Sequence, residues 1–174
     1  MTVSQLLKKE SSLAVIGLGY VGLPVALAFA KKIKVIGFDI NPERIELLKK
    51  NIDPSKEIDT TEFENCDIVF TNDSKELTHA DFFILAVPTP VDDYHVPDLS
   101  LLKKACTLIG SIIKPGDYIV FESTVYPGCT EEDCIPIVEK ESGLKMCANF
   151  KAGYSPERIN PGDRTHRLQK VIKI

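Results

Sequence analysis

The residues most clearly suited to chemistry are three glycines with the spacing G-x-G-x-x-G. Gly17, Gly19 and Gly22 directly follow the apolar run Leu13–Ile16, and Asp39 comes 22 residues after Gly17. In this motif the first glycine permits a tight turn, the second lets a pyrophosphate approach the backbone, and the third lets a helix pack closely on a strand. Asp39 would accept hydrogen bonds from ribose hydroxyls and would repel a 2′-phosphate. The pattern therefore predicts a site for NAD rather than NADP.

The elements around the glycines are those that a dinucleotide site requires. A short β-branched apolar run precedes them, and residues 20–31 contain only one charged residue, at the last position. A second apolar run over residues 34–39 ends at Asp39. A strand, a glycine turn, a helix and a second strand ending in an acid form the context that confirms such a motif. The alternative is an ordinary turn between a strand and a helix.

The rest of the sequence continues to alternate between strand and helix patterns. Apolar runs predict strands over residues 13–16, 34–39, 68–71, 81–87, 118–121 and 147–152. Helices are predicted between them: one capped by Asn41 with Pro42 in its first turn, and one over residues 101–113 with helical periodicity, capped at Asp98. The expected fold is α/β, a Rossmann-like doubly wound parallel sheet with helices on both faces.

The unusual loops all follow predicted strands. These loops contain residues 17–22, Asp39, residues 87–90, residues 123–124 and residues 154–158. Ligands of open parallel sheets bind beyond the carboxyl ends of the strands, so one edge of the sheet is expected to hold the site.

Composition excludes several classes of protein. The 174 residues are 44% hydrophobic and carry a net charge of −4 without a basic block, which argues against nucleic acid and membrane partners. No apolar run reaches the roughly 20 residues of a membrane span, and the polar start lacks a signal-peptide core, so a cytoplasmic location is expected. Five cysteines without a secretory signal predict free thiols. No metal site is expected, because Cys129 and Cys134 lack a second flanking pair.

Four motifs in this order resemble the UDP-glucose/GDP-mannose dehydrogenase family. They occupy residues 15–24, 87–90, 122–128 and 154–158, and the resemblance covers residues 13–163. The sequence of residues 154–163 is most similar to the UDP-N-acetylglucosamine and UDP-N-acetylgalactosamine 6-dehydrogenases, which supply surface polysaccharide synthesis. The UDP-glucose branch usually has Asn-Pro-Glu-Phe-Leu there.

The resemblance implies oxidation of a UDP-sugar C6 alcohol to a carboxylate with two NAD. In the family a cysteine of a second domain captures the aldehyde intermediate, which splits a difficult step into easier ones. None of the five cysteines matches it, and Cys129 is interpreted as incidental. Residues 1–174 are therefore expected to be the N-terminal NAD-binding domain of a longer, homo-oligomeric enzyme, without its central helix and its C-terminal UDP-sugar domain. A UDP-glucose 6-dehydrogenase or an NAD-binding module without catalysis remain the alternatives.

Site residues follow from the resemblance by position. Thr124 and Glu157 are expected to be catalytic, and Glu157 and Arg158 to contact the substrate. Thr89 and Pro90 match a loop that passes the adenosine and ribose side of NAD. The full set expected to contact the cofactor, beyond the three glycines and Asp39, is Tyr20, Val21, Arg44, Val87, Pro88, Thr89, Pro90, Ser123 and Thr124. Each of these residues also has a simpler interpretation. Glu157 and Arg44 could be solvated surface charges, and Thr124 could end a strand by hydrogen bonding to its own backbone.

Overall fold

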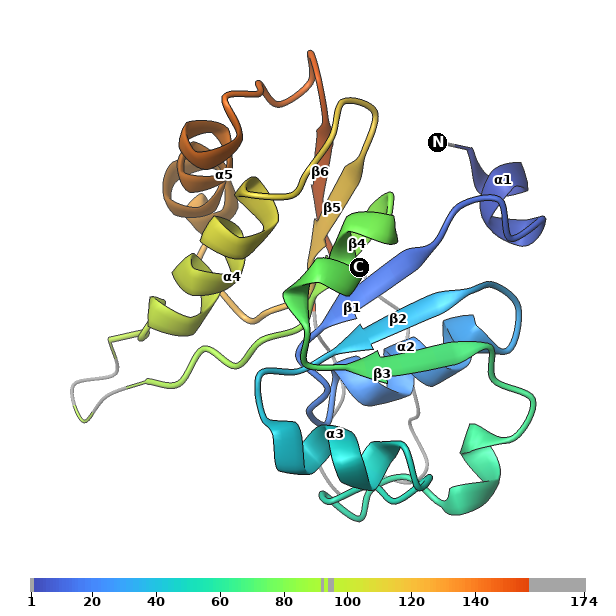
Figure 1. The fold of residues 1–174 in the computed structure, drawn as a ribbon. Helices are drawn as coiled ribbons and strands as arrows, with labels where there is room; N and C mark the ends of the chain where they lie inside the picture. The colour runs from blue at the N-terminus through green and yellow to red at the C-terminus, as the bar shows by residue number, and fades with distance from the viewer. Residues whose placement is uncertain (1, 92, 94–95, 157–174) are drawn as a thin grey trace.

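A single sheet of six parallel strands forms the centre of the molecule (Figure 1). The computed structural model describes residues 2–91, 93 and 96–156. The strands lie in the order β3-β2-β1-β4-β5-β6. Their bounds are β1 Leu13–Ile16, β2 Val35–Phe38, β3 Ile68–Thr71, β4 Phe82–Leu85, β5 Tyr118–Phe121 and β6 Lys151–Tyr154. The strand order reverses between β1 and β4, which is where ligands of such sheets bind.

Helices cover both faces of this sheet, which confirms the predicted fold class (Figure 1). The α-helices are α1 Val3–Leu7, α2 Gly22–Ala30, α3 Pro42–Leu48, α4 Ser100–Gly110 and α5 Ile135–Ser142. Short 3-10 helices lie at η1 Thr60–Phe63 and η2 Ser74–His79, and a π-helical turn, η3 Thr130–Cys134, leads into α5. Among the residues described, no helix has the length and apolar character needed to cross a membrane.

Strand β1 shows how the two faces are filled. Ala14 and Ile16 pack in the apolar cluster formed with α4 and α5, whereas Leu13 and Val15 pack in the cluster formed with α2. All four residues are buried. A continuous apolar run is the pattern expected of a parallel strand that is covered on both sides.

Helix α3 begins where the sequence predicts. The Asn41 side-chain oxygen accepts hydrogen bonds from the backbone N–H groups of Glu43, at 3.0 Å, and Arg44, at 3.2 Å. Pro42 occupies the first turn, where its missing N–H leaves no hydrogen bond unmade. This cap fixes the start of the helix directly after Asp39.

The predicted starts of β6 and α4 differ from the structure for reasons that the backbone shows. Strand β6 begins at Lys151 rather than at residue 147, because Cys147 adopts a left-handed conformation with φ of 66° and donates its N–H to the Phe150 carbonyl at 2.8 Å. Helix α4 begins at Ser100 after Leu99, so Asp98 stands one residue too early to be its cap. Asp98 instead accepts the Ser100 N–H at 2.8 Å.

Candidate dinucleotide site

The three glycines differ sharply in what surrounds them. Gly17 has φ of +89°, and a Cβ there would lie 2.6 Å from the Ala86 carbonyl oxygen. A Cβ on Gly22 would lie 1.8 Å from the Gly17 carbonyl oxygen. A Cβ on Gly19 would meet no atom within 4 Å. Gly17 and Gly22 are therefore required by the fold, whereas Gly19 borders open space of the kind that a pyrophosphate would occupy.

Asp39 and Arg44 hold the loop between these glycines. Asp39 Oδ2 accepts the Leu18 N–H at 3.0 Å, and Arg44 Nη1 donates to the Leu18 carbonyl at 3.1 Å. The second carboxylate oxygen, Asp39 Oδ1, accepts the Asn41 N–H at 2.9 Å, and Arg44 Nε lies 3.7 Å from Asp39 Oδ2. Both backbone polar groups of Leu18 are thus fixed by side chains from the end of β2 and from α3, which preorganises the glycine loop.

A pocket of about 310 Å³ lies beside Gly19, between the start of α2 and the ends of β4 and β5. Nine of the residues expected to contact the cofactor line it. The lining residues are Gly19, Tyr20, Val21, Ala86, Val87, Pro88, Thr89, Pro90, Glu122, Ser123 and Thr124. Segments far apart in the sequence are therefore brought together as expected, and only Ala86 and Glu122 are additions.

Two hydroxyl groups join the loops that form the pocket wall. Ser123 Oγ donates to the Val87 carbonyl at 2.6 Å, and Thr89 Oγ1 donates to the Thr124 carbonyl at 2.6 Å. Each of the two loops, one after β4 and one after β5, thus donates one hydrogen bond to the other. The hydroxyl protons of Ser123 and Thr89 serve the protein itself, so a ligand would meet their oxygens as acceptors.

The strand order separates this pocket from Asp39. Asp39 follows β2, whereas Thr89 and Pro90 follow β4, and β1 lies between those two strands. A carboxylate at the end of the second strand marks the adenosine side of a dinucleotide site. The loop of Thr89 and Pro90 therefore lies across β1 from Asp39. Its expected contact with the adenosine and ribose side of NAD stays a prediction.

Glu122 is one of the two pocket residues that were not predicted to contact the cofactor. Its side chain is buried, and its Oε1 accepts the Ser155 hydroxyl at 3.3 Å. An acid directly after an apolar strand was the available signal, because burial of a carboxyl group needs a reason. The expected substrate residues Glu157 and Arg158 lie outside the described residues, which end at Pro156.

Cys129 is placed as a packing residue rather than a nucleophile. It is fully buried, and burial together with the neighbouring Cys134 thiol raises its pKa to about 11. A thiol with so high a pKa carries little thiolate near neutral pH. Within the described part of the chain, no group of three or more His, Cys, Asp or Glu side chains is arranged to hold a metal ion.

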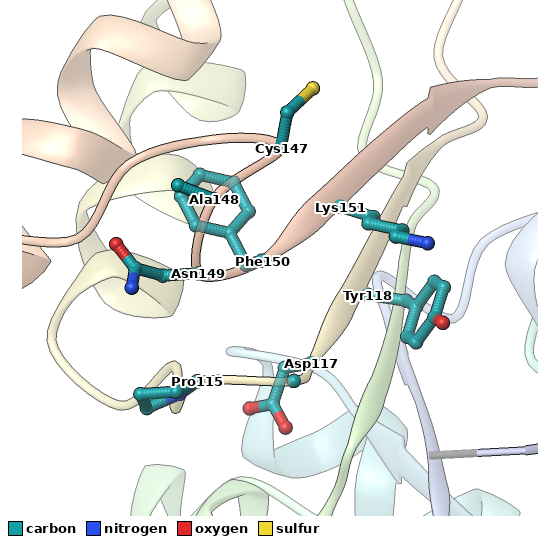
Figure 2. Close-up of a pocket in the computed structure, with 9 residues that line it drawn as sticks. Pro115, Asp117, Tyr118, Cys147, Ala148, Asn149, Phe150 and Lys151 are labelled. Carbon is teal, nitrogen blue, oxygen red and sulfur yellow. The ribbon is translucent and has the colours of Figure 1, made fainter.

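A second cavity, of about 450 Å³, lies at the opposite edge of the sheet, where β5 and β6 begin (Figure 2). Asp117 and Tyr118 line it from β5 and the turn before it, and Cys147 and Lys151 from the β6 side. The Lys151 ammonium lies 5.8 Å from the centroid of the Tyr118 ring. None of the predicted site residues lies here, so the candidate cofactor site is confined to the carboxyl edge.

Residues 11–174 match the family described as UDP-glucose/GDP-mannose dehydrogenase family, NAD binding domain. The chain is 52% identical over 163 residues to Protein CapL of Staphylococcus aureus. It is 51% identical over 167 residues to UDP-N-acetyl-D-glucosamine 6-dehydrogenase of Pseudomonas aeruginosa. The crystal structure of NDP-N-acetyl-D-galactosaminuronic acid dehydrogenase from Methanosarcina mazei Go1 superposes with a TM-score of 0.83 at 31% identity.

These comparisons cover nearly all of this chain but only part of each relative. The two sequence alignments cover 94% and 95% of the chain, yet 38% and 40% of the relatives. The structural superposition covers 95% of the chain and 38% of the solved one. The glycine loop, the parallel sheet and the aligned sequence agree. The chain therefore belongs to the UDP-glucose/GDP-mannose dehydrogenase family, as the NAD-binding domain of that family.

Proposed function

We propose that this chain is the cofactor-binding part of a UDP-N-acetylhexosamine 6-dehydrogenase. The observation that carries the proposal is the pocket beside Gly19, where nine of the expected cofactor residues gather around open space. The choice of sugar is supported by relatives. Two proteins named UDP-N-acetyl-D-glucosamine 6-dehydrogenase are 51% and 48% identical to the chain, whereas proteins named UDP-N-acetyl-D-mannosamine dehydrogenase are 33–35% identical.

The residues of the carboxyl edge have distinct roles in this proposal. Asp39 accepts hydrogen bonds from the adenosine ribose hydroxyls. The backbone N–H groups that follow Gly19, at the start of α2, donate hydrogen bonds to the pyrophosphate. NAD, when bound, supplies the acceptor for the hydride that leaves C6 of the sugar. Val87 and Ser123 orient the nicotinamide half across β1, and Thr89 and Pro90 pass the ribose on the adenosine side.

The catalytic roles in this proposal belong to Thr124 and Glu157. Thr124 is exposed and lines the pocket. In this proposal its hydroxyl orients water or a developing oxyanion. Glu157 acts in acid–base steps, and Arg158 contacts the phosphates of the substrate. Oxidation of a primary alcohol to a carboxylate consumes two NAD and one water, so the remaining catalytic groups, including the nucleophilic cysteine, would come from sequence outside this chain.

Three further features complete the proposal. The activity would serve the synthesis of surface polysaccharide precursors in the cytoplasm. The complete enzyme would be a homo-oligomer. The 174 residues would bind NAD but would not turn over alone.

The test starts with the gene. An open reading frame that continues past Ile174 would supply the complete protein for assay with UDP-N-acetylglucosamine, UDP-N-acetylgalactosamine and UDP-glucose. The proposal predicts two NADH per sugar and a preference for an N-acetylated substrate, with no turnover by residues 1–174 alone. A preference for UDP-glucose, or turnover by the 174-residue chain, would contradict it.

A further inference from the structure

Glu122 is a buried acid for which the proposed chemistry has no role. Only 6% of its surface is exposed, and it directly follows β5. Its backbone N–H donates to the Leu85 carbonyl at 2.8 Å, so the residue continues the pairing of β5 with β4. The side chain is thus anchored on a rigid strand end rather than on a free loop.

On one side, Glu122 contacts the segment that follows β6. The Ser155 hydroxyl donates to Glu122 Oε1 at 3.3 Å, and the Ser155 N–H donates to the Phe121 carbonyl at 2.9 Å. Ser155 is therefore tied to the end of β5 through both its backbone and its side chain. Ser155 also stands two residues before Glu157, the expected acid–base residue.

On the other side, Glu122 lines the pocket beside Gly19. It shares this wall with Ser123, whose hydroxyl bonds to the Val87 carbonyl, and with Thr124. The wall lies across β1 from Asp39, which places it at the half of the dinucleotide away from the adenosine. Glu122 is the residue that joins this half of the pocket to the segment leading to Glu157.

We propose that Glu122 is a positioning residue of the nicotinamide half of the site. Its carboxylate holds Ser155 against β5, and this contact fixes both the pocket wall and the start of the segment that carries Glu157. The inference rests on the proposed NAD site and adds a residue that the motif resemblance did not assign. It predicts that loss of Glu122 affects ligands with a nicotinamide half and spares ligands without one.

The test compares NAD with ADP by calorimetric titration of the 174-residue chain. The variants are Glu122→Ala, Glu122→Gln and Ser155→Ala, and the control is Glu131→Gln, an acid-to-amide change at an exposed position. Glu122→Ala should weaken NAD roughly tenfold, because the pocket wall loses the side chain that holds Ser155, and should leave ADP within about twofold. Glu122→Gln should restore most of the NAD affinity, because its amide oxygen still accepts the Ser155 hydroxyl.

The Ser155 variant keeps the proposal testable if Glu122→Ala does not fold. Ser155→Ala should weaken NAD without affecting ADP. The double variant with Glu122→Ala should lose less than the sum of the two single losses, because the two side chains share a hydrogen bond. Hydrogen exchange of the Ser155 amide should accelerate in Glu122→Ala and stay slow in Glu122→Gln.

Three results would overturn the inference: equal losses for NAD and ADP, additive losses in the double variant, or unchanged NAD affinity in Glu122→Ala. A wild-type chain that binds neither ligand would instead overturn the NAD site itself, and this inference with it.

Discussion

Alanine substitutions at two glycines of one motif should have opposite consequences. At Gly22 a Cβ would lie 1.8 Å from the Gly17 carbonyl oxygen and 3.1 Å from the Ala86 Cβ, so backbone must move. Overpacking of this kind costs about 3 kcal/mol, which lowers the melting temperature of a chain of this size by about 10 °C. At Gly19 a Cβ meets nothing within 4 Å, so the free energy of unfolding should change by less than about 1 kcal/mol.

NAD affinity, unlike stability, should be sensitive to substitution of Gly19. A methyl group on Gly19 occupies the space assigned to the pyrophosphate and should remove one or two charge-assisted hydrogen bonds, which weakens NAD by about 10- to 100-fold. Gly143→Ala is the matched control. It has φ of +70° and no atom within 4 Å of a Cβ, so it should cost about 1 kcal/mol of stability and no NAD affinity.

The assays are thermal unfolding followed by circular dichroism and calorimetric titration with NAD. A folded Gly19→Ala variant that binds NAD like the wild type would refute the assignment of the open space to the pyrophosphate. A Gly22→Ala variant that melts with the wild type would refute the packing argument.

Three other changes test separate parts of the structure. Asn41→Ala should destabilise the chain by about 1 kcal/mol, because the N-terminus of α3 loses its cap, and an unchanged denaturant midpoint would contradict this. Ser123→Ala should destabilise the chain by about 1 kcal/mol and weaken NAD several-fold, because the Val87 carbonyl loses its donor. Denaturant unfolding measures the stability and calorimetric titration measures the NAD affinity. If neither changes, the hydrogen bond from Ser123 to Val87 does not support the pocket. At pH 8 iodoacetamide should label Cys147 and spare Cys129, because Cys147 is exposed and the raised pKa of Cys129 suppresses its thiolate; mass mapping that shows equal rates would contradict the burial of Cys129.

Features encoded by neighbouring residues were predictable from the sequence. The glycine loop, the cap at Asn41 and the strand over Leu13–Ile16 depend on local spacing, local hydrogen bonds and apolar runs. The alternation of these elements predicts the parallel sheet, and the sheet predicts that the loops meet at one edge. The pocket beside Gly19 confirms that meeting.

Features created by tertiary contacts were not predictable in this way. The bond of Arg44 to the Leu18 carbonyl joins residues 26 apart, and the contact of Ser155 with Glu122 joins residues 33 apart. The placement of Thr89 across β1 from Asp39 depends on the strand order, which the sequence pattern does not state. The late start of β6 depends on the left-handed conformation of Cys147, a residue type that rarely adopts it.

The most direct test of the proposed NAD site is calorimetric titration of the chain with NAD and with NADP, for the wild type and for Asp39→Ala. NAD should bind to the wild type, and NADP should bind more weakly because its 2′-phosphate meets the Asp39 carboxylate. The variant should lose NAD affinity. The variant should also lose stability, because Asp39 accepts the N–H groups of Leu18 and Asn41. Equal binding of NAD and NADP by the wild type, or unchanged NAD affinity in the variant, would contradict the assignment of Asp39 to the adenosine ribose.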